Sequence, residues 1–130
     1  MLVLIVDSSA QIIERMEEII SDTGNITAIH GAVSYPEAKK LFNENKHDAV
    51  LLDIDLPGND SLKLLEEIKK TRKKTCVIIQ FTHINRYIQE RCKSLGADFF
   101  IDKYYDFEKI GGLLNSIPGI NTIEDLSKKK

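Results

Sequence analysis

Residues 49–58 have the sequence AVLLDIDLPG, in which a continuous apolar segment runs into two acidic residues and a Pro-Gly pair. A short apolar run of this kind is typical of a strand that is buried on both faces of a parallel sheet. Pro57-Gly58 ends the strand and turns the chain. Ligands bind outside the carboxyl ends of the strands in an open α/β sheet, so Asp53 stands where chemistry is expected. The alternative is that Asp53 only caps or solvates a strand end.

Four further apolar segments predict strands, and helical patterns separate all five. These strands are expected at Leu2–Val6, Ile26–Ala32, Cys76–Phe81 and Asp98–Ile101. Strands that alternate with helices predict an α/β fold with a doubly wound parallel sheet and right-handed crossovers. We therefore expect a five-stranded sheet in the flavodoxin-like order 2-1-3-4-5, with five helices on its two faces.

Local sequence marks where several of these helices begin and end. Ser8-Ser9, Asp60-Ser61 and Asp106 can each cap a helix, and Ser34 with Glu37 has the spacing of a capping box. Gly96 is a good stop for the fourth helix. The core face of the third helix is predicted to comprise Leu62, Leu65 and Ile68.

The last helix and the end of the chain are less regular. Gly111-Gly112 falls inside the last helix at about 1 kcal/mol of lost helix propensity per glycine, so we expect that helix to be irregular or mobile there. Residues 1–117 are predicted to form one domain. Residues 118–130 are expected to be a tail or linker, with a short helical turn around Ile123–Leu126.

Composition narrows the classes of function. The chain of 130 residues has 18 Lys and Arg against 20 Asp and Glu, a net charge of −2, which argues against direct nucleic-acid binding. No apolar run is long enough to span a bilayer, so no membrane partner is expected. Cys76 and Cys92 lie in apolar patterns and are interpreted as small buried hydrophobes in a reducing, cytoplasmic compartment. The basic end of the third helix, Lys69–Lys74, is a docking patch or, as we favour, a solvated end whose cations suit the helix dipole.

Polar residues follow four of the predicted strands. Asp7 and Ser8 follow the first strand, Asp53 ends the third, Thr82 follows the fourth and Lys103 the fifth. In a parallel sheet these ends meet at one edge. A carboxylate pair there suits a hard cation such as Mg²⁺, while a hydroxyl and an ammonium can hold phosphoryl oxygens. A central carboxylate among them is a candidate nucleophile for phosphoryl transfer.

The chain resembles the receiver domain of bacterial two-component response regulators, including the single-domain chemotaxis type, over roughly Leu2 to Ile117. Four segments carry the resemblance: Val3–Asp7, Asp48–Gly58, Val77–Thr82 and Gly96–Lys103. The resemblance implies that histidine kinases supply the phosphoryl group. It also implies that the surface of the fourth helix, fifth strand and last helix reports the change to a partner.

The resemblance also implies roles for individual residues. Asp53 is implied to be the phosphoacceptor, contacted by Thr82 and Lys103 once phosphorylated. Asp7, Asp53 and the backbone carbonyl of Asp55 are implied to hold Mg²⁺. Phe100 stands where the family keeps an aromatic rotamer switch, which moves together with Thr82.

Two departures from the family pattern concern the metal and access to Asp53. Ser8 stands where the family has a second acidic residue, and a hydroxyl is a weak or absent Mg²⁺ ligand, so we expect weak Mg²⁺ binding and slow phosphorylation. We hypothesise that the carboxylate of Asp55 partly compensates by holding metal-bound water. His83 follows Thr82 where the family usually has Ala or Gly. Its ring narrows access, stabilises the phosphoryl group when protonated, or has no role.

The third departure from the family pattern is the residue directly after Lys103. Tyr104 replaces a proline that the family joins to the lysine through a cis bond. A non-proline cis bond costs roughly 3 kcal/mol. Either the bond is trans and Lys103 is aimed differently, or strain is retained for function.

Three functions are compatible with these observations. The leading hypothesis is a stand-alone receiver in phosphorelay signal transduction, which acts on an unknown downstream protein or as a homodimer. The alternative is a degenerate receiver that works as a phosphorylation-independent interaction module, as Ser8, His83 and Tyr104 suggest. A flavin or nucleotide binder is disfavoured because residues 7–10 contain no glycine. An independent enzyme is not expected. We place six residues on or near the output surface: Ile84, Tyr87, Ile88, Arg91, Tyr104 and Tyr105.

Overall fold

The computed structural model describes residues 1–23 and 25–117, and the predicted tail at 118–130, with its helical turn, lies outside the described residues. The strands are β1 Leu2–Val6, β2 Ala28–Ala32, β3 Ala49–Asp53, β4 Cys76–Phe81 and β5 Phe99–Asp102. The α-helices are α1 Ala10–Ser21, α2 Tyr35–Glu44, α3 Asp60–Thr71, α4 Arg86–Ser94 and α5 Ile110–Ser116, and two 3-10 turns are η1 Pro57–Asn59 and η2 Phe107–Lys109.

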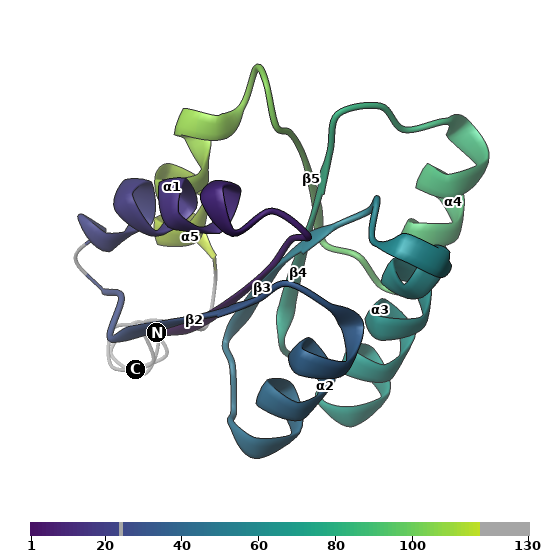
Figure 1. The fold of residues 1–130 in the computed structure, drawn as a ribbon, viewed down its shortest axis with the longest axis horizontal. Helices are drawn as coiled ribbons and strands as arrows, with labels where there is room; N and C mark the ends of the chain where they lie inside the picture. Colours follow the sequence, from purple (N-terminus) through teal and green to yellow (C-terminus); the bar gives the residue numbers. More distant parts are fainter. Residues whose placement is uncertain (24, 118–130) are drawn as a thin grey trace, which may run out of the picture.

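The five strands form one parallel sheet in the order β2-β1-β3-β4-β5, which confirms the predicted fold class. Helices α1 and α5 cover one face of the sheet, and α2, α3 and α4 cover the other (Figure 1). The central strand β3 is buried along its whole length. The continuous apolar run at residues 49–52 therefore has the double-sided burial that its sequence predicts.

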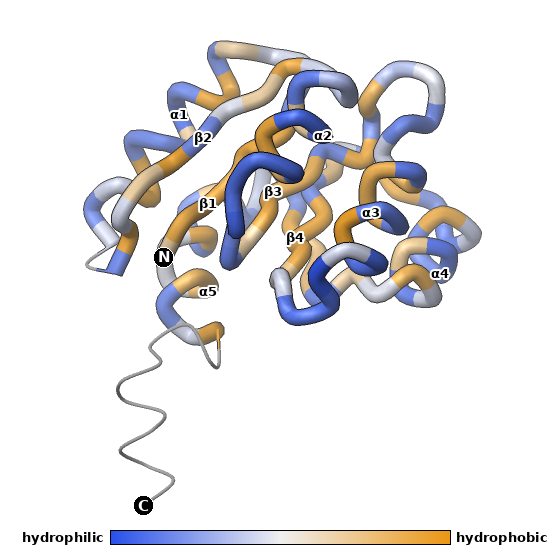
Figure 2. Tube along the Cα trace, turned by 90° about the horizontal axis from the view of Figure 1, so that it is seen from below, coloured by the Kyte–Doolittle hydropathy of each residue, from blue (hydrophilic) through white to orange (hydrophobic). Residues whose placement is uncertain are grey.

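Each face of the sheet has its own apolar core. Under α1 and α5 the core contains Val3, Ile5, Leu51 and Ile78, whereas Leu4 and its alternating neighbours pack under α2, α3 and α4. Apolar residues follow the strands through the middle of the molecule, with polar residues on the outer faces of the helices (Figure 2). Since successive side chains of a strand point to opposite faces, one apolar strand supplies both cores.

Two strand boundaries differ from the prediction. The second strand begins at Ala28 rather than Ile26, because the backbone N–H of Ile26 donates to the carbonyl of Thr23 and closes a turn. The fifth strand covers Phe99–Asp102 rather than Asp98–Ile101. Asp98 lies before it, where its carboxylate accepts from the N–H of Val77 at 2.8 Å.

The capping predictions hold for two helices. The Oγ of Ser9 accepts from the N–H of Ile12, and the Oγ of Ser34 accepts from the N–H of Glu37. The carboxylate of Glu37 reaches back to the N–H of Val33 at 2.8 Å. Gly96 follows α4 with φ 104°, a conformation that glycine adopts without steric cost.

The predicted cap of α3 by Asp60-Ser61 is wrong. Asp60 is already the first helical residue, and the preceding Asn59 makes no side-chain capping bond. Ser61 is instead fully buried and closes the loop after β3, because its Oγ donates to the carbonyl of Asp53 at 2.6 Å and accepts from the N–H of Leu56 at 3.3 Å. The core face of α3 also contains Leu64, while Leu62 is only half-buried.

The last helix is irregular, but not at its two glycines. Gly111 and Gly112 lie within α5, and the irregular part is the 3-10 turn η2 immediately before it. Asp106 precedes that turn without a side-chain capping bond. Its carboxylate accepts instead from the N–H of Asp102 at 3.2 Å, which ties the turn to the end of β5.

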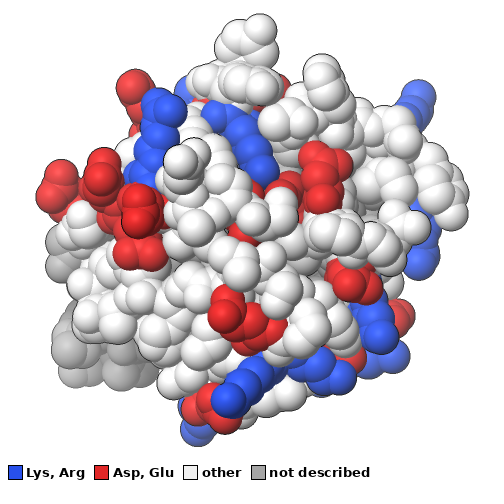
Figure 3. All heavy atoms as spheres, viewed as in Figure 1, with Lys and Arg blue, Asp and Glu red and all other residues white. Residues whose placement is uncertain are grey.

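Charged side chains of both signs occupy the face of the molecule seen in Figure 3, with an acidic cluster over α1 beside basic side chains, and basic and acidic side chains intermixed over α2 and α3. Two cations at the basic end of α3 are structural. Lys69 binds the carbonyl of Thr75 and the carboxylate of Asp98, and Arg72 binds the carbonyls of Phe42 and Asn45. Within residues 1–23 and 25–117, no helix has the length and apolarity needed to cross a membrane.

Two histidines meet near the opposite end of the sheet from Asp53. His47 precedes β3, is 2% exposed, and its Nε2 lies 2.9 Å from Nδ1 of His30 on β2. Burial, His30 and Arg72 lower the pKa of His47 to about 4, against an opposing effect of Asp48. The folded protein therefore holds this imidazole neutral.

We predict that His47 makes the fold acid-sensitive. The neutral His47 contributes about 3 kcal/mol to the free energy of unfolding. This contribution is fully present above pH 6.5, the pKa of the residue in the unfolded chain, and it is lost as the pH falls toward 4. Urea unfolding of the wild type and of His47→Gln across this pH window measures the difference. A parallel loss of stability in both proteins would contradict the prediction.

Candidate functional site

Strand alternation brings three charged side chains to one face of the sheet. Asp7 follows Val3 and Ile5 at two-residue spacing, Asp53 follows Leu51, and Lys103 extends the same alternation beyond β5. All three therefore project from the face that α1 and α5 cover, at the carboxyl ends of their strands.

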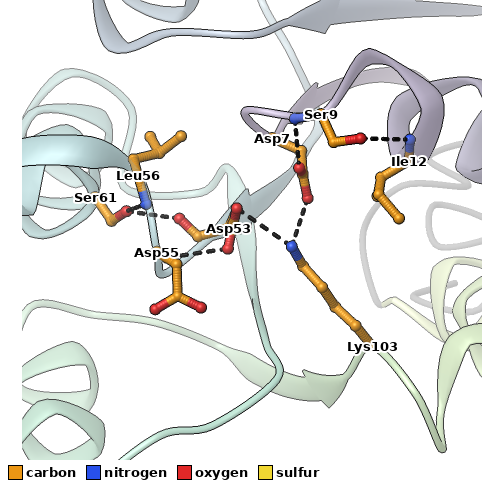
Figure 4. Close-up of polar contacts among 8 residues, drawn as sticks. All are labelled: Asp7, Ser9, Ile12, Asp53, Asp55, Leu56, Ser61 and Lys103. Carbon is orange, nitrogen blue, oxygen red and sulfur yellow. Dashed lines mark hydrogen bonds and ion pairs between the residues drawn. The ribbon is translucent and has the colours of Figure 1, made fainter.

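Lys103 joins the two carboxylates. Its Nζ lies 2.6 Å from Oδ2 of Asp7 and 3.2 Å from Oδ2 of Asp53, and the side chain reaches both from the β5 side (Figure 4). Asp7 is 1% exposed and Asp53 2%, so the ion pairs are shielded from water. The ammonium offsets one of two buried negative charges, which without a partner would be costly to desolvate.

Backbone N–H groups hold the other oxygen of each carboxylate. Oδ1 of Asp7 accepts from the N–H of Ser9 at 2.9 Å, and Oδ1 of Asp53 accepts from the N–H of Asp55 at 2.9 Å. Burial raises the pKa of Asp53, although the Asp55 N–H and Lys103 oppose that rise. Burial lowers the pKa of Lys103, but its contacts with Asp7 and Asp53 outweigh this effect and leave the pKa raised. The pair of carboxylates and the ammonium thus form one coupled unit.

The other predicted site residues lie around this unit. Thr82 directly follows β4 and is half-buried, and none of the hydrogen bonds found among the described residues joins its hydroxyl to Asp53 or Lys103. Phe100 packs into the opposite core, under α2, α3 and α4. The structure therefore places the expected aromatic switch across the sheet from the carboxylates.

The three departures from the family pattern are all exposed. Ser8 and Asp55 lie at the surface, and the Asp55 carboxylate points away from Asp7 and Lys103 (Figure 4). His83 is exposed and lines a pocket of about 160 Å³ together with Asp55. Tyr104 is 75% exposed and follows a trans peptide bond, and Lys103 nevertheless reaches both carboxylates.

The carboxylates of Asp7 and Asp53 are of the ligand type that Mg²⁺ requires. Two carboxylates supply the hard oxygen ligands that Mg²⁺ prefers, and Mg²⁺ commonly binds proteins through one or two carboxylates while keeping several waters. However, every carboxylate oxygen of Asp7 and Asp53 already accepts from an N–H or faces Lys103. Among the residues that the structure describes, no group of three His, Cys, Asp or Glu is arranged to hold a metal.

The buried cysteines are not reactive groups of this site. Cys76 and Cys92 are free and buried, and burial raises the pKa of their thiols to about 12 and about 11. Both behave as the small core hydrophobes that the sequence predicts.

The sequence-family model of the response regulator receiver domain matches residues 3–115. The chain belongs to this family. A protein-glutamate methylesterase/protein-glutamine glutaminase of Methanospirillum hungatei is 32% identical over 98% of this chain. The chain spans 39% of that relative and 28% and 29% of two similar ones, from Paraburkholderia xenovorans and Thiobacillus denitrificans.

Solved receiver structures share the fold. A CheY-like receiver domain protein of Methanospirillum hungatei superposes with a TM-score of 0.81 at 20% identity, over 99% of this chain and 98% of that one. The BeF3-activated receiver domain of DrrB, a protein of Thermotoga maritima, gives a TM-score of 0.74 at 21% identity, over 89% and 95% of the two chains. These likenesses confirm the receiver fold.

Two buried polar residues lie beside the site, and the sequence alone indicated no role there for either of them. Ser61 anchors the loop after Asp53, and its only sequence signal is a hydroxyl near a helix start, which also suits a cap. Gln80 interrupts the apolar pattern of β4 and is fully buried. A polar residue inside a run that is otherwise apolar is the signal that marks it.

We predict that Ser8→Asp tightens Mg²⁺ binding by about tenfold, because it adds a carboxylate beside Asp7 in partly solvated surroundings. Titration of each protein with Mg²⁺, followed by NMR of the Asp7 and Asp53 amides, measures the change. Asp55→Asn, measured alongside, tests the compensation by Asp55. Unchanged affinity in that variant would exclude compensation, and unchanged affinity in Ser8→Asp would contradict the role given to position 8.

Proposed function

We propose that the chain is a two-component receiver that takes a phosphoryl group onto Asp53 from a histidine kinase or phosphotransfer protein. One observation carries the proposal: Asp53 is a buried carboxylate at the end of the central strand, in contact with Lys103 and beside a second carboxylate, Asp7. Phosphoryl transfer to a carboxylate needs a nucleophile and a cation that offsets the phosphoryl charge, and a second acidic group would help to hold the metal.

The proposed reaction is a displacement at phosphorus. An oxygen of Asp53 attacks the phosphorus atom, the bond from phosphorus to the donor breaks, and the leaving group keeps the electron pair. Lys103 offsets negative charge on the phosphoryl oxygens as they approach. Mg²⁺, when bound by Asp7, Asp53 and the backbone carbonyl of Asp55, would supply further neutralisation of that charge.

We further propose that the α4–β5–α5 face carries the signal. Phe100 and Thr82 are the proposed switch, since β5 carries Phe100 on one face and leads to Lys103 on the other. Tyr87, Tyr104 and Tyr105 are 71–85% exposed, which suits a surface that meets a partner protein or a second copy of the chain. The phosphoryl group would favour one of two conformations that the domain already samples.

A phosphorylation-independent module is the second candidate. It is favoured by the three departures from the family pattern, because Ser8 adds no charge beside Asp7, and His83 and Tyr104 are both exposed. The methylesterase activity of the longer relatives belongs to those proteins, of which this chain spans the smaller part. We propose signalling, not ester hydrolysis, for the chain described here.

The central test is phosphorylation of Asp53. We expect one phosphoryl adduct in the intact mass after incubation with Mg²⁺ and acetyl phosphate, and no adduct on Asp53→Asn. An adduct that persists in the variant would disprove Asp53 as the acceptor. If neither protein is modified by acetyl phosphate or by a panel of histidine kinases, the phosphorylation-independent module becomes the better interpretation.

We predict that His83→Ala speeds phosphorylation by acetyl phosphate severalfold, because it removes an exposed ring that lines a pocket with Asp55 and that we propose to hinder the phosphodonor. Initial rates of adduct formation measure the effect. Asn85→Ala changes another residue of the same pocket and serves as the control, although it also removes the cap of α4. Equal rates in the wild type and His83→Ala would remove the steric role of His83.

A further inference from the structure

Gln80 is a fully buried amide whose hydrogen-bonding capacity is unused. It is 0% exposed, and neither Nε2 nor Oε1 has a hydrogen-bond partner among residues 1–23 and 25–117. Such a group costs free energy in the folded protein, because water satisfied it in the unfolded chain. A buried amide without a partner at this place requires an explanation that core packing does not provide.

Gln80 lies beside Asp53 in the sheet. It pairs with Asp53 in the β3–β4 ladder, and it follows Cys76 and Ile78 at two-residue spacing on the face that α1 and α5 cover. Asp7, Asp53, Gln80 and Lys103 thus project from the same face of four consecutive strands. Lys103 has to cross β4 on this face to reach Asp53 and Asp7 from β5.

The free protein has few acceptors left for the Gln80 amide. Oδ1 of Asp53 accepts from the Asp55 N–H, and its Oδ2 faces Lys103. A phosphoryl group would increase the number of acceptors near the Gln80 amide, because it brings three strong acceptor oxygens to Asp53. The donors that already serve Asp53 are one backbone N–H and one ammonium that is shared with Asp7, so the phosphoryl oxygens can accept from a further donor beside the proposed contact with Thr82.

We propose that Gln80 is a further phosphoryl-contacting residue, whose Nε2–H groups donate to the phosphoryl-bearing side chain of Asp53. This role rests on the proposed function of Asp53. The Oε1 of the same amide can accept from Lys103, which has three N–H groups and uses two of them in its ion pairs. Phosphorylation would then satisfy an amide that the free protein leaves without partners.

The test uses beryllofluoride, BeF3⁻, as a mimic of the phosphoryl group, with Mg²⁺ and the full chain. Gln80→Met replaces the amide with an unbranched apolar side chain of similar length. We expect BeF3⁻ to bind this variant about tenfold more weakly in a ¹⁹F NMR titration, as the loss of a hydrogen bond to a charged group implies. The matched control is Gln89→Met on α4, which should bind as the wild type does.

Two further measurements separate this role from a structural one. The urea midpoint of free Gln80→Met should rise, because the substitution removes an unsatisfied buried amide, so weaker binding cannot reflect a damaged fold. In the wild type, the side-chain NH₂ signals of Gln80 should shift when BeF3⁻ binds. This second measurement needs no variant, and Gln80→Leu replaces Gln80→Met if the latter does not fold.

The outcomes distinguish this role from the function on which it rests. Weaker binding by Gln80→Met together with shifted NH₂ signals supports the contact. Equal binding by the wild type and Gln80→Met, or unshifted NH₂ signals, overturns it and leaves phosphorylation of Asp53 in place. If the wild type binds no BeF3⁻ and takes no phosphoryl group, both proposals fall together.

Discussion

The Lys103 ammonium, held 2.6 Å from Asp7 and 3.2 Å from Asp53, is the contact on which the site depends. Two carboxylates at 1–2% exposure would repel each other and lose their hydration without a cation between them. That cation comes from β5 at the edge of the sheet, whereas the carboxylates come from β1 and β3 near its centre. The strand order therefore matters for the charges of the site, because it brings the cation from β5 to the two buried carboxylates.

Side chains alternate between the two faces of the sheet with a period of two residues, and this alternation places both the apolar core and the charged site. Val3, Ile5 and Leu51 pack beneath α1 and α5, and the next residues of that alternation are Asp7 and Asp53. A shift of one residue in register would bury the carboxylates among the apolar side chains under α2, α3 and α4. Apolar burial along β1 and β3 thus fixes the register, and the register aims the charged groups at one another.

The sequence alone predicted those parts of the structure that depend on pattern, including the strands, their order and the strand ends that carry Asp7, Asp53 and Lys103. It failed where two interactions compete for one side chain. Ser61 suits a helix cap, but long-range closure of the loop after Asp53 uses its hydroxyl instead. The contact between His30 and His47 joins positions 17 residues apart on different elements, which no local pattern encodes.

The proposed signal from a phosphorylated Asp53 would have to cross the sheet to reach Phe100, because Phe100 packs on the opposite face from the carboxylates. Strand β5 is the physical link, since it carries Phe100 among the residues under α4 and leads directly to Lys103. The N–H of Lys103 is also held by the carbonyl of Phe81 at 2.8 Å, immediately before Thr82. Any change in the acceptors of the Lys103 ammonium is thus applied to a residue that follows β5, the strand of the proposed output surface, and is also tied to the end of β4. This link between Asp53 and β5 can act as a switch only if this end of the sheet has two stable conformations. The charge at Asp53 must then stabilise one of these conformations more than the other.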